Sequence, residues 1–196
     1  MKPNWFVAFP VPASDWLETV LATLPATCRP FQPTDVHMTL AFLGAMDPAQ
    51  KDDVIAAMNQ IKAAPFEVTL GQMLALPNPK RVSALSFALQ DGKENAARLM
   101  GLHRDALYRA ATARPDTRPP LPHITIARPI RKFKAEGQKD AREWAQQVKP
   151  PGLVILINQI ALYTWADDRR FKQFKIIYQH RLSPLNEKSP EVIRAF

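Results

Sequence analysis

Two short strings of the sequence constrain its fold more than any other feature: His37-Met38-Thr39-Leu40 and His123-Ile124-Thr125-Ile126. Successive side chains of a β-strand point to opposite faces, so the His and Thr of each string share one face. The apolar residues share the other face, where they can pack. Each string therefore predicts a half-buried strand that presents an imidazole beside a hydroxyl. Two such strands facing each other would gather both pairs around one small anionic group.

The rest of the pattern predicts an alternation of strands and helices. Apolar runs predict strands at 5–9, 38–43, 66–70, 82–89, 123–127, 154–165 and 171–182. Helical spacing of apolar residues predicts helices at 15–24, 47–61, 94–111 and 140–148. The proline-rich segment 114–122 predicts a rigid, extended connector that leads into the second motif.

The two halves of the chain are loosely alike, and each contributes one His-x-Thr strand. We therefore expect an α+β fold with two pseudo-symmetric lobes, in which largely antiparallel sheets line a central groove and the helices lie outside. One domain is expected over residues 1–183, followed by a C-terminal tail at 184–196.

The net charge indicates the kind of binding partner, and the cysteine content indicates the cellular compartment. The net charge of +8 favours a polyanion such as nucleic acid. A single cysteine, Cys28, excludes an internal disulfide and favours a reducing compartment. No apolar run is long enough to span a membrane. We expect a cytoplasmic protein that acts as a monomer.

Paired imidazoles and hydroxyls favour acid–base chemistry on a phosphoester. A neutral imidazole can take a proton from water while a protonated one gives a proton to the leaving oxygen. Threonine hydroxyls can donate to the phosphate oxygens. The strings lack carboxylates at metal-ligand spacing, and a hydroxyl is a poor zinc ligand, so neither metal nor cofactor is expected. A strained 2′,3′-cyclic phosphate would suit such metal-free chemistry.

In these residues the chain resembles the two-histidine phosphoesterase superfamily, and within it the RNA 2′,3′-cyclic phosphodiesterases, also called 2′-5′ RNA ligases. The resemblance runs from Phe6 to about Leu182 and is strongest over 36–44 and 122–128. It implies that His37 and His123 serve as acid and base and that Thr39 and Thr125 bind phosphate. It also suggests that Arg128 contacts phosphate.

The chain departs from this family where a base would stack. Val7 and the Pro120-Leu121 pair occupy places where the family often has an aromatic residue. Tyr163 and Trp165 could supply a stacking face instead, or simply pack in the core or rim. Basic residues that could guide a phosphate backbone are Arg128, Arg131, Lys132, Arg169 and Arg170.

These features favour an enzyme that hydrolyses RNA 2′,3′-cyclic phosphate ends to a 2′-phosphate. Several alternatives stay open. The same site could act on a small cyclic nucleotide, an ADP-ribose cyclic phosphate or a 2′,5′-oligonucleotide, and the protein could be a non-catalytic RNA-binding module. Ligation, the reverse reaction in this family, also stays open, as does the choice of histidine that acts as base.

Overall fold

The computed structural model describes residues 2–13 and 15–183, and the tail expected at 184–196 lies outside them. The strands are β1 (Asn4–Pro10), β2 (Cys28–Pro30), β3 (His37–Ala45), β4 (Phe66–Asn78), β5 (Arg81–Leu89), β6 (His123–Pro129), β7 (Val154–Ile157), β8 (Gln159–Trp165) and β9 (Phe174–Arg181). The α-helices are α1 (Asp15–Leu21), α2 (Lys51–Asn59), α3 (Lys93–Ala110) and α4 (Lys134–Gln147). Short 3₁₀ turns are η1 (Pro33–Asp35), η2 (Pro48–Gln50) and η3 (Arg131–Phe133). None of these helices is long and apolar enough to cross a membrane.

The strands form one antiparallel path, β7-β4-β5-β6-β3-β1-β8-β9, with β2 paired to β6. The path is thinnest between β3 and β6, which share one register pair among the described residues, Met38 with Ile124. This junction separates a terminal half (β1, β3, β8 and β9) from a central half (β2, β4, β5, β6 and β7). Each half contains one motif strand.

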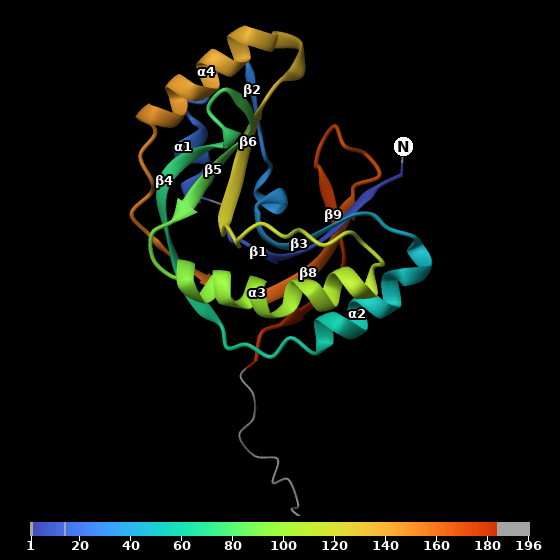
Figure 1. Cartoon of the computed structure of the whole chain (residues 1–196). Coiled ribbons are helices and arrows are strands. Elements are labelled where there is room, and N and C mark those ends of the chain that lie inside the picture. Colours follow the sequence, from blue (N-terminus) through green and yellow to red (C-terminus); the bar gives the residue numbers. More distant parts are fainter. Residues whose placement is uncertain (1, 14, 184–196) are drawn as a thin grey trace, which may run out of the picture.

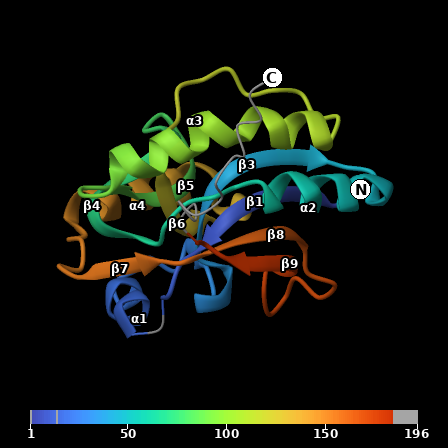
Figure 2. The same ribbon diagram turned by 90° about the horizontal axis from the view of Figure 1, so that it is seen from below.

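The helices cover the outside of the sheet, as Figures 1 and 2 show. Helix α3 packs against β3 and carries α2 beside it, whereas α4 packs against β4, β5 and β6. The predicted α+β class, with mostly antiparallel strands and external helices, is therefore confirmed. Residues 114–122, predicted as a rigid, extended connector, form no helix or strand between α3 and β6.

The sequence of β1 is apolar on both faces because each face packs against other apolar side chains. Val7 and Phe9 belong to the main core, which extends to the helices. Phe6 and Ala8 point the other way and form a small separate cluster with Tyr163 and Ala161 of β8. The chain therefore has a second apolar layer on the opposite side of β1, and His37 packs against its Phe6 ring.

The structure divides one predicted strand, begins one predicted helix earlier and contains one strand that was not predicted. The run 154–165 is not one strand: it divides at Asn158, because β7 pairs with β4 of the central half and β8 pairs with β1 of the terminal half. Helix α4 begins at Lys134 and not at 140. A Cβ atom at its Gly137 would lie 3.3 Å from the Cβ of Phe133, which is tighter than an ordinary contact, so this glycine has a packing role inside the helix. The three-residue strand β2 was not predicted.

Candidate active site

The two motif strands lie side by side at the junction of the halves. Met38 and Ile124 are register partners and are both fully buried. One residue to either side, the antiparallel register sets His37 across from Thr125 and Thr39 across from His123. The two-residue period turns these four side chains to the face opposite Met38 and Ile124. The structure thus brings together the four residues that the two motifs predicted.

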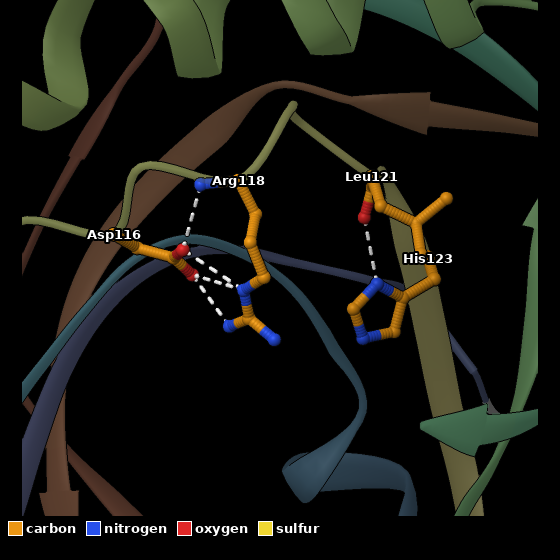
Figure 3. A network of polar contacts seen from close by, with 4 residues as sticks. All are labelled: Asp116, Arg118, Leu121 and His123. Carbon is orange, nitrogen blue, oxygen red and sulfur yellow. Dashed lines mark hydrogen bonds and ion pairs between the residues drawn. The ribbon is translucent and has the colours of Figure 1, made fainter. Parts of the chain in front are cut away.

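Both imidazoles are held in the same way by the backbone. The Nδ1 atom of His37 lies 2.6 Å from the carbonyl oxygen of Asp35, and that of His123 lies 2.7 Å from the carbonyl oxygen of Leu121. A carbonyl only accepts, so each Nδ1 carries the hydrogen and donates it. Each Nε2 is then the free acceptor. Figure 3 shows this nitrogen of His123 pointing away from Leu121.

The surroundings favour neutral imidazoles. The pKa of His37 is lowered to about 4: burial is the largest cause, and the positive charges of Arg128 and of protonated His123 add to it, against the opposing effect of the hydrogen bond to the Asp35 carbonyl. Burial also lowers the pKa of His123. The influence of His123 on the pKa of His37 means that the two rings lie within electrostatic range of each other. In the free protein at neutral pH, each imidazole is therefore available to accept a proton.

A buried serine that the sequence did not single out positions one of the hydroxyls. Ser86 on β5 is the register partner of Thr125, and their hydroxyl oxygens are 2.9 Å apart. Ser86 is fully buried and Thr125 is 9% exposed. This contact restricts the rotation of the Thr125 hydroxyl. Ser86 lies in an ordinary strand pattern, so no local signal distinguishes it from a small core residue.

Tyr163 lies beneath the site and not on its surface. Its side chain is 1% exposed, and burial followed by the charge of Asp35 raises its pKa. The ring stacks on Phe6 with centroids 4.9 Å apart, and Phe6 in turn lies 4.7 Å from the His37 ring. A base has no exposed face of Tyr163 on which to stack. The expected stacking role conflicts with this burial, and the ring instead supports the layer that carries His37.

A groove of about 1530 Å³ opens beside the motif strands. His37 and Thr39 line it, whereas His123 and Thr125 of the neighbouring strand β6 are not among its lining residues. The cationic lining residues are Arg29, Lys80, Arg81, Arg128, Arg131, Lys134 and Arg169. Of the basic residues proposed from sequence, Lys132 and Arg170 are not in this lining. Arg170 is instead paired with Asp168 at 2.7 Å.

Four aromatic side chains line the groove beyond the motif residues: Phe6, Phe42, Trp165 and Phe174. Trp165 was predicted as a stacking candidate, and the Arg169 guanidinium lies 4.4 Å from its ring centroid. Phe42 was not predicted and is 55% exposed. In the β1–β3 register, Val7 pairs with Ala41 and Ala8 with Thr39, so Leu40 is an extra residue on β3. This bulge shifts the alternation and turns Phe42 to the face of Thr39.

Sequence comparisons find similarity to known phosphoesterases. Residues 7–84 match the family described as LigT like Phosphoesterase, a range that includes His37 and Thr39. An RNA 2′,3′-cyclic phosphodiesterase of Geobacillus stearothermophilus is 34% identical over 135 residues, which are 66% of this chain and 40% of that protein. The chain thus spans less than half the length of this curated relative.

Solved structures share the fold. The crystal structure of E. coli LigT complexed with 3′-AMP has a TM-score of 0.72 and 22% identity, over 92% of this chain and 99% of that one. A Thermus thermophilus protein gives a TM-score of 0.71 and 22% identity, over 93% of this chain and 99% of that one. The family model matched over residues 7–84, the 34% identical relative and the shared fold make this chain similar to LigT-like phosphoesterases.

Proposed function

We propose that this protein hydrolyses RNA ends that carry a 2′,3′-cyclic phosphate and leaves a 2′-phosphate. The observation that carries the proposal is the matched pair of His37 and His123, each with Nδ1 fixed by a backbone carbonyl and Nε2 left for proton transfer. The name of the Geobacillus relative supports the reaction. The cationic lining of the groove supports a nucleic-acid substrate.

In the proposed reaction the two imidazoles divide the proton transfers. The neutral one takes a proton from water as the water oxygen bonds to phosphorus, and the protonated one gives its proton to O3′ as the P–O3′ bond breaks. The pKa values of His37 and His123 are lowered in the free protein. A bound anionic phosphate would raise the pKa of the acid and let it hold its proton. The near symmetry of the pair permits either assignment.

The remaining groups stabilise charge on the phosphate. Thr39 and Thr125 are proposed to donate their hydroxyl hydrogens to the non-bridging oxygens, and Ser86 keeps the Thr125 hydroxyl in place. Arg128 adds a positive charge close enough to influence His37. A preorganised donor at such a position typically contributes about 3 kcal/mol to the stability of a transition state.

No metal takes part in this proposed mechanism. The described residues contain no group of three or more His, Cys, Asp or Glu side chains that could hold a metal ion. The absence of a metal requirement stays a prediction, and the rate measured with and without EDTA tests it. Strong inhibition by EDTA would contradict the mechanism.

The main test replaces each histidine separately. His37→Ala and His123→Ala should each lower the turnover of a cyclic-ended oligonucleotide by about 10²-fold or more, because each removes one proton-transfer group. His103→Ala, in α3 and away from the groove lining, is the matched control and should keep full activity. Thermal unfolding checks that the variants fold. Full activity in either site variant would overturn the proposal.

The same variants separate catalysis from simple binding. A non-catalytic RNA-binding module would give no product with the native protein. It would also keep its salt-sensitive RNA binding after loss of both histidines. Product formation that depends on His37 and His123 excludes that alternative.

A further inference from the structure

Two arginines face each other in the wall of the groove. Arg29 on β2 is the direct register partner of Arg128 on β6, and both line the groove. Like charges directly opposite on neighbouring strands repel and destabilise a sheet. Burial lowers the pKa of Arg128, and so do the charges of Arg29, Arg169 and Arg131. This cluster therefore concentrates positive charge at a place where the charge does not stabilise the fold.

A buried glutamine holds two members of this cluster together. The side-chain oxygen of Gln173 accepts hydrogen bonds from Arg29 at 2.9 Å and from Arg169 at 3.3 Å. Gln173 is 7% exposed, and its backbone N–H donates to the Asp35 carboxylate at 2.8 Å. Arg29 belongs to the central half, whereas Arg169 and Gln173 belong to the β8–β9 loop of the terminal half. This arginine–glutamine bracket thus joins both sides of the groove.

The nearby acidic side chains are already engaged. Asp168 pairs with Arg170 and Asp167 pairs with Lys175. Within residues 2–13 and 15–183, no ion pair includes Arg29, Arg128 or Arg169. Gln173 accepts hydrogen bonds but brings no negative charge. The guanidinium groups are therefore ordered by a neutral partner and keep their charge for a ligand.

We propose that Arg29 and Arg169, ordered by Gln173, form a second phosphate subsite beside the paired histidines. This subsite rests on the proposed function and takes the phosphodiester on the 5′ side of the terminal nucleotide. The preferred substrate then has at least two phosphates, one cyclic at the histidines and one at the arginine bracket. A cyclic mononucleotide fills only the first position.

The test compares two substrates that differ by this phosphate: 2′,3′-cyclic AMP and the dinucleotide ApA with a 2′,3′-cyclic end. The native protein should prefer the dinucleotide. Arg29→Gln and Arg169→Gln should each lower the ratio of kcat/KM, dinucleotide over mononucleotide, by roughly tenfold or more, as expected for a lost charged hydrogen bond. Arg170→Gln removes the same charge from the neighbouring residue outside the groove lining and should leave the ratio unchanged.

Gln173→Glu provides an isosteric variant of the bracket. A carboxylate at this position would neutralise Arg29 and Arg169 in place, so the ratio should again fall. Equal losses on both substrates in the arginine variants would assign these residues to the reacting phosphate and overturn the subsite. If the ratio fell equally in Arg170→Gln, the loss of any nearby positive charge would explain the effect, and the subsite would again be overturned.

A binding experiment separates this inference from the proposed function. If the native protein turns over neither substrate, the proposed function fails, but calorimetric binding of ApA with a 2′-phosphate still tests the bracket. Weaker binding in Arg29→Gln than in Arg170→Gln supports the subsite. Equal binding in the two variants overturns it.

Discussion

The carbonyl oxygen of Asp35 accepts a hydrogen bond from the His37 ring while the carboxylate of the same residue is fully buried. That carboxylate accepts backbone hydrogen bonds from Gln173 at 2.8 Å and Phe174 at 3.0 Å. One residue thus connects the imidazole to the end of the β8–β9 loop. A buried carboxylate is stable only when such bonds satisfy it, so its position is well determined.

Asp35→Asn tests this connection. The backbone carbonyl that holds His37 remains. One carboxylate oxygen, however, is replaced by an amide NH₂ group, which is a donor and faces a backbone N–H donor. We expect the free energy of unfolding to fall by about 2 kcal/mol, and kcat to fall more than KM rises, because the His37 ring loses its fixed position. Denaturant unfolding and steady-state kinetics measure both. Unchanged stability together with unchanged kcat would show that the contact between Asp35 and the β8–β9 loop does not contribute to folding or catalysis.

The pH profile tests the electrostatics of the pair. Both histidine pKa values lie below the ordinary value, with that of His37 at about 4, so the bell-shaped profile of kcat/KM should have its maximum on the acid side of pH 6.5. Arg128→Gln removes a positive charge that lowers the His37 pKa. The limb that His37 controls should therefore move to higher pH.

The moving limb shows which of the two apparent pKa values of the pair belongs mainly to His37. A shift of the acid limb assigns His37 the lower value, and a shift of the alkaline limb assigns it the higher one. Arg170→Gln is the matched control, since Arg170 is paired with Asp168 outside the groove lining. A profile that is identical in Arg128→Gln and the native protein would contradict the electrostatic account.

The local pattern of the chain was sufficient to predict that two motif strands each present a His and a Thr on one face. A period of two fixes the relative facing of His37 and Thr39, and of His123 and Thr125, whatever the sheet order is. The adjacency of the two strands followed from the chemistry that both motifs share. The α+β class followed from the alternation of strand and helix patterns.

The supporting residues have no such local signature. Ser86 becomes notable only through its register with Thr125, and Gln173 only through contacts with Asp35 and Arg29, which lie 138 and 144 residues away. The bulge that exposes Phe42 depends on how β3 pairs with β1. The break at Asn158 depends on which half of the sheet each flanking segment joins. These features arise from tertiary packing, which periodicity alone does not encode.

Two substitutions of Tyr163, which stacks on Phe6, test whether this residue supports the site or contacts the substrate. Tyr163→Phe keeps the ring and removes the hydroxyl, so we expect kcat/KM to stay within about twofold of the native value, as for a near-isosteric core change. Tyr163→Leu removes the stacked ring and should lower stability by about 2 kcal/mol and reduce kcat. Thermal unfolding and kinetics on the cyclic dinucleotide measure these effects. A large loss of activity in Tyr163→Phe would instead assign the hydroxyl a direct role.

Phe42 is the aromatic residue of the groove that contributes least to the core. Because its side chain is 55% exposed, Phe42→Ala should change stability little. A nucleobase stacked on this ring would lose about 1–3 kcal/mol of binding, so KM should rise by roughly tenfold while kcat stays near the native value. Leu102→Ala is the control, as Leu102 is 61% exposed on α3 and not in the groove lining. An unchanged KM in Phe42→Ala would exclude Phe42 as the stacking face and leave that role to Trp165.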